Sequence, residues 1–485
     1  FKRDTIILWG KPMDKKPTVV SLFSGAGGFD WGFHQAGFQT ILACEKLKSP
    51  ASTLAINLNL KVIEDVENFS YQGEPSVLIS DIKAVDFSRI RISPDVLIGG
   101  PPCQDFSMAQ GQERQGLNGG RGKLYVQFVR ALMYFQPKFF VFENVPGLKS
   151  ANDGSAYSTI LSDLENLEQK RLEIISQNNT IKVPQICVEG YDILFSEIII
   201  ATKLGVPQTR KRLIILGVRK DLSRVIDQGT LEKLKKEINL KIGGINSSFE
   251  KYPLTCIEIL EGKTLKKLQN RYRKIMGDYQ DLFKKSYGIN ASEKTRMWEQ
   301  LTMDIIKDYF IVNGLNYKKD FSRNEFNKAM REHEALLSDL GVLNRPIRKT
   351  IFPDKTNALP RQSKNVTARM FNIPPDENYS FVDGTEWQVE GKNISFIYRR
   401  SAPLKPASTV LAYGGGGTYG YHYERSRGQL TLRERARIQT FSDDFIFSGK
   451  GVRAQIGEAV PPILGEKIAL TIKWLSSIFD PGQQP

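Results

Sequence analysis

Histidine and cysteine are scarce in this chain, which has three histidines and four cysteines among its 485 residues. Cys44, Cys103, Cys187 and Cys256 are scattered, without the paired spacing of a zinc site or a disulfide framework. The chain also lacks an apolar run long enough to cross a membrane, and its N-terminus does not have the pattern of a signal peptide. We therefore expect a protein of the reducing cytosol, with no metal centre and no membrane contact, in which a reactive thiol survives.

Acidic residues are outnumbered by basic ones. The chain has 53 Asp and Glu against 68 Lys and Arg, which gives a formal net charge of +15. Nine of these fifteen excess positive charges fall between residues 220 and 400. A basic surface of this size favours a polyanionic partner and salt-dependent binding of nucleic acid. The length is sufficient for a large domain and a second, smaller one.

The stretch from Gly99 to Ser107, GGPPCQDFS, is the most informative of the chain. An apolar strand expected over residues 95–100 ends in two glycines, and two prolines then fix the backbone before Cys103. Because a loop of this rigidity has no structural need for a thiol, its position favours a nucleophile. The alternative is a small buried hydrophobic side chain, the usual role of a free cysteine.

A strand, a glycine turn and the start of a helix are expected in TVVSLFSGAGGFDWGF, residues 18–33. Glycines there let the backbone approach a ligand, and the helix N-terminus offers free N–H groups. The next two expected strands lead to Glu45 and Asp81, carboxylates suited to ribose hydroxyls and an adenine amino group. Either carboxylate alone fits a helix cap or a solvated loop residue. Together, at the ends of neighbouring strands, they indicate a nucleoside site.

Six motifs in a fixed order resemble those of DNA (cytosine-5)-methyltransferases of the prokaryotic restriction–modification type. They are FSGAGGF (23–29), GGPPCQDFS (99–107), FENVPGL (142–148), QTRKRLIILG (208–217), LTLRERARIQTF (430–441) and QIGEAVPP (455–462). The resemblance covers roughly residues 18–221 and 398–475. It implies an α/β fold, with a Rossmann-like S-adenosylmethionine-dependent methyltransferase domain built on a mostly parallel sheet, and a smaller inserted target-recognition domain.

The resemblance also implies three consecutive parts of the chain. Residues 1–221 would form the first part of the catalytic domain, 222–400 the target-recognition domain and 401–485 the return to the catalytic domain. Within the second part, residues 263–343 look like a helical elaboration. We expect an enzyme of the bacterial or archaeal cytosol that acts on double-stranded DNA as a monomer, with a cognate restriction endonuclease as a separate partner.

A catalytic set of four residues follows from the same resemblance. Cys103 would add to C6 of cytosine, which makes C5 reactive toward the sulfonium methyl group. Glu143 would protonate or hydrogen-bond N3, while Arg212 would contact O2 and orient Glu143. Arg210 would brace the nucleophile loop or a phosphate; the alternative is an exposed residue at the head of a strand.

The cofactor implied is S-adenosyl-L-methionine, with S-adenosyl-L-homocysteine as its product. The residues expected to contact it are Phe23, Ser24, Gly25, Gly27, Gly28, Glu45, Lys46, Asp81, Ile82, Pro102, Leu124, Glu458, Ala459 and Val460. Two of these depart from the family pattern. Lys46 stands where a bulky apolar residue commonly packs on the adenine, and Glu458 replaces an asparagine. Because Ala459 and Val460 still match, we expect cofactor binding to persist.

A thiol on a loop cannot reach a base inside a duplex, so this mechanism requires flipping of the target cytosine. The glycine-rich segment 111–125 resembles the mobile loop that closes over the flipped nucleotide in this family, although an ordinary surface loop is the alternative. The residues expected to contact DNA are Gln104, Ser107, Arg121, Arg425 and Arg427. The last two lie in a second glycine-rich segment, 413–428, for which a plain hinge is the alternative.

Two other functions fit part of the pattern. A tRNA methyltransferase of the same fold would carry a Cys-Phe-Thr motif and a small recognition segment. This chain has Thr255-Cys256-Ile257 instead, together with a large inserted region. A non-catalytic DNA-binding module would need no nucleophile, whereas Cys103, Glu143 and Arg212 are all present. The sequence therefore favours DNA over RNA, and catalysis over binding alone.

Overall fold

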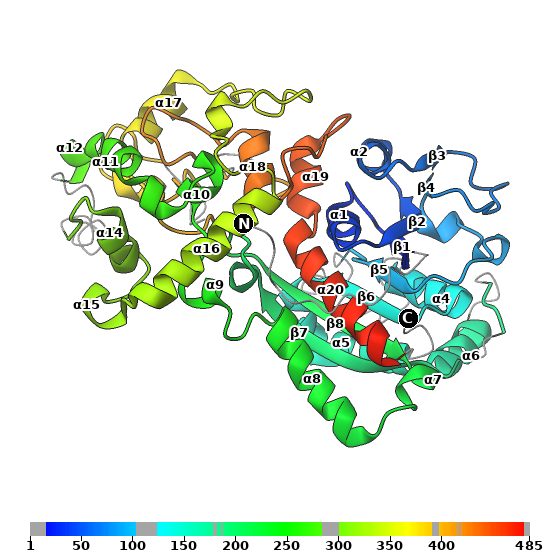
Figure 1. Cartoon of the computed structure of the whole chain (residues 1–485). Helices are drawn as coiled ribbons and strands as arrows, with labels where there is room; N and C mark the ends of the chain where they lie inside the picture. Colours follow the sequence, from blue (N-terminus) through cyan, green and yellow to red (C-terminus); the bar gives the residue numbers. More distant parts are fainter. Residues whose placement is uncertain are drawn as a thin grey trace. The chain divides into compact units, whose positions relative to one another are not determined.

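A sheet of eight strands lies in the first of two compact units of the chain (Figure 1). The computed structural model describes residues 16–102, 124–177, 182–185, 188–283, 300–389, 397–414, 417–418 and 420–479. The first unit comprises Phe1–Ile199, Arg212–Gly243 and Gly465–Pro485. The second comprises Ile200–Lys211 and Gly244–Leu464. The chain therefore passes from one unit to the other four times.

The strands of the sheet follow the order β3-β4-β2-β1-β5-β6-β8-β7. All neighbouring pairs from β3 to β6 are parallel, whereas β8 pairs antiparallel with β6. This confirms the expected α/β class with a mostly parallel sheet. The strands are β1 (Thr18–Leu22), β2 (Gln39–Glu45), β3 (Lys61–Ile63), β4 (Ser76–Ile79), β5 (Val96–Gly99), β6 (Phe139–Asn144), β7 (Tyr191–Ile200) and β8 (Lys211–Arg219).

The central strands are apolar because both faces of the sheet are covered. Every residue of β5 is buried, as are the last four residues of β1. Strands of a parallel sheet that are covered on both faces carry continuous apolar runs rather than an alternating pattern. One core cluster joins β5 and β6 to α4 (Leu124–Phe135), where the Phe128 ring lies edge-on to Phe142 with ring centroids 5.4 Å apart.

The order of the strands reverses between β1 and β5. From β1 the chain moves to one side, to β2, and later returns to the other side, to β5. In open α/β sheets, ligands bind outside the carboxyl ends of the strands at such a switch point. Leu22 and Gly99, the last residues of these two strands, are paired in register. The glycine turn and the Gly-Gly-Pro-Pro segment thus leave the sheet side by side.

Helices cover the sheet of the first unit, and α1 (Gly28–Gln35) follows the glycine turn as expected from the sequence. Helix α8 packs through Leu231, Leu234, Ile238 and Ile242, and Lys241 Nζ lies 4.8 Å from the centroid of the Trp474 ring of α20. The helices are α1 (Gly28–Gln35), α2 (Lys48–Leu58), α4, α5 (Ser155–Glu165), α6 (Leu167–Gln177), α7 (Lys220–Ser223), α8 (Gln228–Ile242) and, from Gly465 onward, α20 (Pro462–Phe479). Among the described helices, none is both long and apolar enough to cross a membrane.

The second unit is mainly helical. Helix α10 ends at Glu261, because Gly262 adopts a left-handed conformation (φ 64°). The helices are α9 (Ser248–Lys251), α10 (Cys256–Glu261), α11 (Gln269–Gly277), α12 (Gln280–Phe283), α14 (Ile305–Val312), α15 (Tyr317–Asp320), α16 (Arg323–Asp339), α17 (Lys364–Phe371), α18 (Leu432–Ile438) and α19 (Val452–Glu458).

The compact units do not have the boundaries expected for the three parts of the chain. Residues 222–243 belong to the first unit, because α8 packs there, and residues 401–464 belong to the second. The return to the first unit therefore begins at Gly465 rather than at residue 401. The functions expected of these parts stay predictions.

Candidate active site

The turn after β1 needs three residues with positive φ. Phe23 (φ 54°), Gly25 (φ 54°) and Gly27 (φ 85°) reverse the chain before α1 begins at Gly28. A Cβ on Gly27 would lie 2.3 Å from Cδ1 of Leu54. Only glycine therefore fits at this position, where the turn passes close to α2. The glycine turn was predicted from the sequence. The positive φ of Gly27 and its close approach to Leu54 show why glycine is required there.

A buried aspartate ties the start of α1 to two strands. Asp30 is fully buried and accepts hydrogen bonds from Ser21 Oγ of β1 (2.9 Å) and Thr40 Oγ1 of β2 (3.1 Å). Burial raises the pKa of Asp30 to about 6, although both hydrogen bonds oppose this shift. Asp30 was not expected from the sequence, where it reads as an ordinary residue of a first helical turn.

Glu45, at the end of β2, fastens the glycine turn to the rest of the site. Its carboxylate accepts hydrogen bonds from the backbone N–H of Gly25 (2.9 Å) and of Leu47 (2.8 Å). Ser24 N also donates to the carbonyl of Cys44 (3.2 Å). A carboxylate accepts more than one hydrogen bond, so the side chain of Glu45 holds both backbone segments at the end of β2.

Asp81 follows β4 and combines two interactions at the surface. Its Oδ1 accepts from Lys83 N (3.1 Å), and its Oδ2 lies 3.0 Å from Lys46 Nζ. Burial raises the pKa of Asp81, but the hydrogen bonds with Lys83 and Lys46 outweigh this and lower it below the usual value. Ile82 is buried, and Arg130 Nη2 holds its carbonyl at 2.9 Å. Lys46 and Asp81, which were both expected to contact the cofactor, therefore form an ion pair with each other.

The segment after β5 is packed against β6. A Cβ on Gly100 would lie 2.7 Å from Oε2 of Glu143, and Asn144 Nδ2 donates to the carbonyl of Pro101 at 3.0 Å. Pro102 is exposed and is the last described residue before the gap. The predicted residues Cys103, Gln104, Ser107 and Arg121 lie outside the described residues. The contacts of Gly100 and Asn144 were not expected, although both residues stand inside the quoted motifs.

Glu143 and Arg212 form an ion pair near the ends of two adjacent strands. Arg212 Nε lies 2.8 Å from Glu143 Oε1, and the two side chains are only 16% and 12% exposed. Glu143 is the fifth residue of β6, and Arg212 the second of the antiparallel β8. Separating a partly buried ion pair is costly, because each partner would be left as an uncompensated charge. The pair with Arg212 therefore holds the carboxylate of Glu143 in place. Strand β6 continues through Glu143 to Asn144.

Arg210 lies in the second unit, unlike Arg212, and is fully buried. Its guanidinium donates to the carbonyls of Gly457 (3.1 Å) and Ala459 (3.0 Å), and more weakly to Val410 (3.5 Å). These contacts differ from the expected brace on the nucleophile loop or a phosphate. They hold the backbone of the motif that carries Glu458, Ala459 and Val460, of which Glu458 is exposed and Val460 buried.

The two arginines expected to contact phosphate have partners within the second unit. Arg425 forms a two-pronged ion pair with Asp281, with Nη2 3.0 Å from Oδ2, and its guanidinium lies 4.0 Å from the Phe371 ring centroid. Arg427 Nη2 lies 2.7 Å from Oε1 of the buried Glu434. A phosphate at either arginine would compete with a carboxylate that already satisfies the same donors. Their role as DNA ligands stays a prediction that this geometry disfavours.

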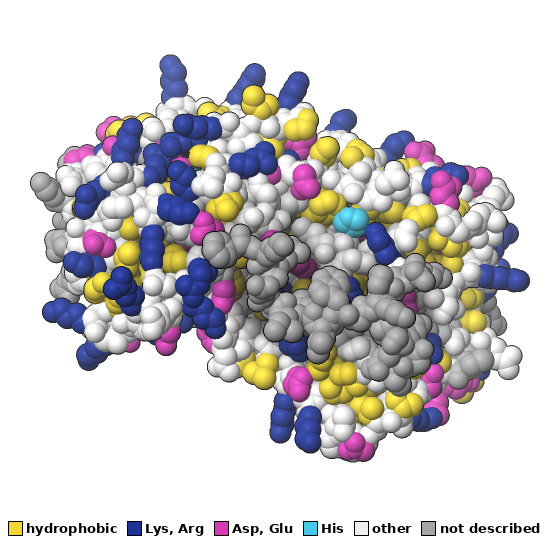
Figure 2. Space-filling model, viewed as in Figure 1, with side chains coloured by type: hydrophobic (Ala, Val, Ile, Leu, Met, Phe, Trp, Pro, Cys, Tyr) yellow, Lys and Arg dark blue, Asp and Glu magenta, His cyan; other side chains and the backbone are white. Residues whose placement is uncertain are grey.

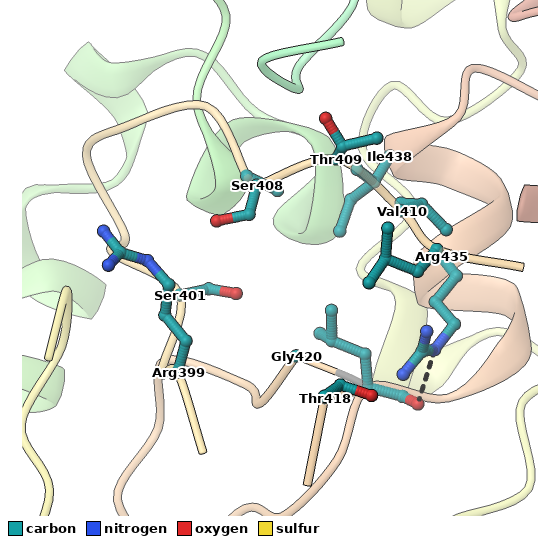
Figure 3. A pocket seen from close by; sticks show the side chains of 12 residues that line it. Arg399, Ser401, Ser408, Thr409, Val410, Thr418, Gly420, Arg435 and Ile438 are labelled. Carbon is teal, nitrogen blue, oxygen red and sulfur yellow. Dashed lines mark hydrogen bonds between the residues drawn. The ribbon is translucent and has the colours of Figure 1, made fainter. Parts of the chain in front are cut away.

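A pocket that is partly open to solvent lies elsewhere in the second unit. Figure 3 shows Arg399 and Arg435 on opposite sides of its opening, with Arg435 Nε 3.4 Å from the carbonyl of Leu430. The lining residues are Arg399, Ser401, Ala407, Ser408, Thr409, Val410, Leu411, Thr418, Gly420, Leu430, Arg435 and Ile438. Its hydroxyl and guanidinium groups are donors of the kind that phosphate oxygens accept.

Metal ligands are not grouped in the part of the chain that the structure describes. No three side chains of His, Cys, Asp or Glu come together there in a way that could hold an ion. His422 is buried beside several arginines; burial and these charges lower its pKa well below the usual value, so it is neutral. Its Nδ1 accepts from Glu424 N at 3.0 Å. This agrees with a structural histidine.

A model of the family described as C-5 cytosine-specific DNA methylase matches residues 17–474 of the chain. The chain belongs to this family. It is 46% identical over 465 residues to DNA (cytosine-5-)-methyltransferase M.ApeKI of Aeropyrum pernix, a match that covers 93% of this chain and 97% of the relative. It is 28% identical to the type II methyltransferase M.NgoFVII of Neisseria gonorrhoeae, over 92% of this chain and 84% of the relative.

The fold of this C-5 cytosine methylase also has a counterpart among solved structures. A crystal structure of an E. coli prophage product, assigned as a DNA modification methyltransferase, matches with a TM-score of 0.51 and 22% identity. The match covers 95% of this chain and 99% of that one. The expected methyltransferase fold is thereby confirmed. The enzyme class is a DNA (cytosine-5-)-methyltransferase, as expected from the motifs.

Proposed function

We propose that this enzyme transfers a methyl group from S-adenosyl-L-methionine to C5 of a flipped cytosine within a specific sequence of double-stranded DNA, as the modification enzyme of a restriction–modification pair. The observation that carries the proposal is the position of Glu143. Its carboxylate lies between Arg212 and Gly100. Gly100 stands three residues before Cys103 in the sequence. The family to which the chain belongs supports the same reaction.

Cys103 is the proposed nucleophile. Its thiolate forms a bond to C6 of the cytosine. The electron pair of the C5–C6 double bond shifts to form a C4–C5 double bond, and the electron pair of the C4–N3 double bond moves onto N3. C5 then has enamine character and can form a bond to a methyl group. Loss of the C5 proton afterwards restores the double bond and expels the thiolate. Cys103 itself lies outside the described residues.

Glu143 and Arg212 stabilise the charge that the ring acquires during this addition. Negative charge develops toward N3 and O2, so a protonated or hydrogen-bonding group at N3 lowers the barrier. The Arg212 guanidinium has donors beyond the Nε that faces Glu143, and its planar fork can serve a carboxylate and a carbonyl together. We propose that Arg212 contacts O2 while it holds Glu143 toward N3.

The cofactor fits the edge of the sheet where β1, β2 and β4 end. The positive φ values of the glycine turn bring backbone close to this edge, and Glu45 and Asp81 follow β2 and β4 there. We propose contacts from Phe23, Ser24, Gly25, Gly27, Gly28, Glu45, Lys46, Asp81, Ile82, Pro102, Leu124, Glu458, Ala459 and Val460. When bound, S-adenosyl-L-methionine supplies an electrophilic sulfonium methyl group. The carboxylates orient the nucleoside by accepting from its hydroxyl and amino groups.

The substrate contacts proposed near the thiol are Gln104, Ser107 and Arg121, all outside the described residues. Extruding a base costs a few kcal/mol of stacking and pairing, which contacts to the opened duplex must offset. The enzyme is proposed to act in the cytosol on the DNA that its partner endonuclease would otherwise cut.

Trapping on 5-fluorocytosine tests this proposal. Fluorine at C5 cannot leave as a proton does, so the thiolate stays bonded to C6 after methyl transfer. We expect a covalent adduct with a 5-fluorocytosine duplex only when S-adenosyl-L-methionine is present, and none with Cys103→Ser. Cys187→Ser is the matched control and keeps the adduct. An adduct on 5-fluorocytidine-containing tRNA but not on DNA would favour the RNA enzyme, and no adduct on either would leave a binding module.

A further inference from the structure

A basic segment of the second unit, residues 349–364, has no role in the proposed chemistry. We name it the basic arm; it runs from the end of the short 3₁₀ helix η7 (Ile347–Lys349) to the start of α17. Four exposed cations lie on it: Lys349, Lys355, Arg361 and Lys364. Among the described residues, none of these four has an ion-pair partner. Cations that are held apart from carboxylates are available to an external anion.

The single acidic residue of the basic arm is already neutralised. Asp354 Oδ2 lies 2.5 Å from Arg433 Nη2 of α18, and both side chains are almost completely buried. Arg433 also donates from Nε to Thr356 Oγ1 (2.9 Å). The pair therefore serves as an anchor and contributes no surface charge. The outer surface of the arm presents four positive charges and no negative one.

An isoleucine on the same arm is held in solvent. Ile351 is 93% exposed, although the neighbouring Phe352 is buried beneath the guanidinium of Arg433, 4.5 Å from its ring centroid. On the other side Ile347 is buried, and Asn357 Nδ2 donates to its carbonyl at 2.8 Å. Both ends of this short stretch are thus fastened. The exposure of Ile351 is therefore imposed by anchored neighbours and does not come from a loose chain.

The surface view agrees with this composition. Figure 1 shows the arm, drawn in yellow, as a loop before α17, and Figure 2 shows hydrophobic side chains beside projecting Lys and Arg side chains in the same region. A single exposed apolar residue is common on protein surfaces and needs no explanation. An isoleucine that anchored neighbours hold in solvent, on a segment with four unpaired cations, differs from such a single exposed residue and does need an explanation. Leu359, 65% exposed, adds a second apolar group to it.

We propose that the basic arm docks on the duplex, with Lys349, Lys355, Arg361 and Lys364 on backbone phosphates and Ile351 against the bases in a groove. Phosphate contacts supply affinity and position, while apolar side chains contact base edges or enter between base steps. A polyanion satisfies all four cations at once, which a neutral protein surface would not do. This inference rests on the duplex DNA substrate of the proposed function.

The salt dependence of binding tests the phosphate contacts. Each phosphate contact contributes about 0.9 to the slope of log K against log salt concentration. Replacing all four cations by alanine should therefore reduce the slope by about 3.6 on a random-sequence 30-base-pair duplex. The matched control replaces Lys307, Lys318, Lys319 and Lys328, exposed lysines of α14, α15 and α16, and keeps the slope. An unchanged slope in the arm variant, or an equal fall in the control, would overturn the proposal.

Photo-crosslinking tests the place of Ile351. A benzoylphenylalanine at position 351 should form a covalent adduct with the same duplex under ultraviolet light. The same photoreactive residue in place of Leu240, which is 48% exposed on α8, should form none. No adduct at 351, or equal yields at the two positions, contradicts the docking. Both assays report on binding alone, so they separate this inference from the proposed chemistry. If 5-fluorocytosine trapping fails while the salt dependence and the photo-crosslinking give the expected results, only the proposed function is removed.

Discussion

Gly100→Ala should damage catalysis without unfolding the protein. The added Cβ would lie 2.7 Å from Glu143 Oε2, whereas ordinary contact begins at 3.4 Å. The carboxylate must therefore move by roughly 0.7 Å, the difference between these two distances. It is the far end of a flexible side chain, and Gly100 has no positive φ, so the move costs little stability. A displacement of about 1 Å at a catalytic group can cost about 100-fold in rate.

The assay is a single-turnover measurement of methyl transfer to duplex DNA. We expect the rate to fall about 10- to 100-fold, with the affinity for S-adenosyl-L-methionine and the melting temperature close to those of the wild type. Gly147→Ala is the matched control, because a Cβ there meets no atom within 4 Å. A wild-type rate in Gly100→Ala would show that the position of Glu143 does not limit the chemistry, and the reasoning would fail.

A shorter carboxylate distinguishes this steric cause from others. In a Glu143→Asp background the carboxylate is withdrawn by one methylene, so the Cβ at position 100 has less to displace. The added loss caused by Gly100→Ala should then be smaller than in the wild type, which a double-mutant cycle measures as a coupling energy. Strictly additive losses would place the effect of Gly100→Ala elsewhere, for example in the loop that follows.

Three further predictions concern charged side chains. Arg212→Lys replaces a planar fork by a point charge, so single-turnover methylation should fall about 10- to 100-fold with cofactor binding intact; equal losses of both would make Arg212 structural. Asp30 keeps its proton up to about pH 6, whereas the unfolded chain releases it near 3.9, so stability relative to Asp30→Asn should fall by about 3 kcal/mol between pH 4 and 6 in denaturant titrations. A flat difference would refute the raised pKa. Arg210→Lys leaves the carbonyls of Gly457 and Ala459 partly unpaired and should raise the KM for S-adenosyl-L-methionine more than it lowers kcat.

The elements that carry the site were predictable from local pattern. An apolar run that ends in glycine or a carboxylate marks a buried parallel strand, and the structure confirms β1, β2, β4 and β5 at the expected places. The ion pair between Glu143 and Arg212 was also expected, from the resemblance of two motifs.

Contacts between distant backbone segments were beyond the reach of the sequence. Gly100 reads as a strand terminator, yet its missing Cβ is what admits the carboxylate of Glu143. Asp30 reads as an ordinary residue of a first helical turn, yet two strands use it as a common acceptor. Neither role has a local signal, because each depends on atoms brought close by the topology of the sheet. The compact units also divide the chain at other residues than the three expected parts, because α8 packs in the first unit by tertiary contact.

Arginine shows most clearly why residue type alone does not identify a ligand. Carboxylates and phosphates offer a guanidinium similar oxygen atoms at similar spacing, so a basic, glycine-rich segment is compatible with either partner. Arg425 and Arg427 read as phosphate ligands, but Asp281 and Glu434 occupy their donors. In the part of the chain that the structure describes, the four cations of the basic arm have no such carboxylate, and the one acidic residue among them is bound by the buried Arg433. A count of charges cannot separate these two groups of cations, whereas the carboxylates around them do.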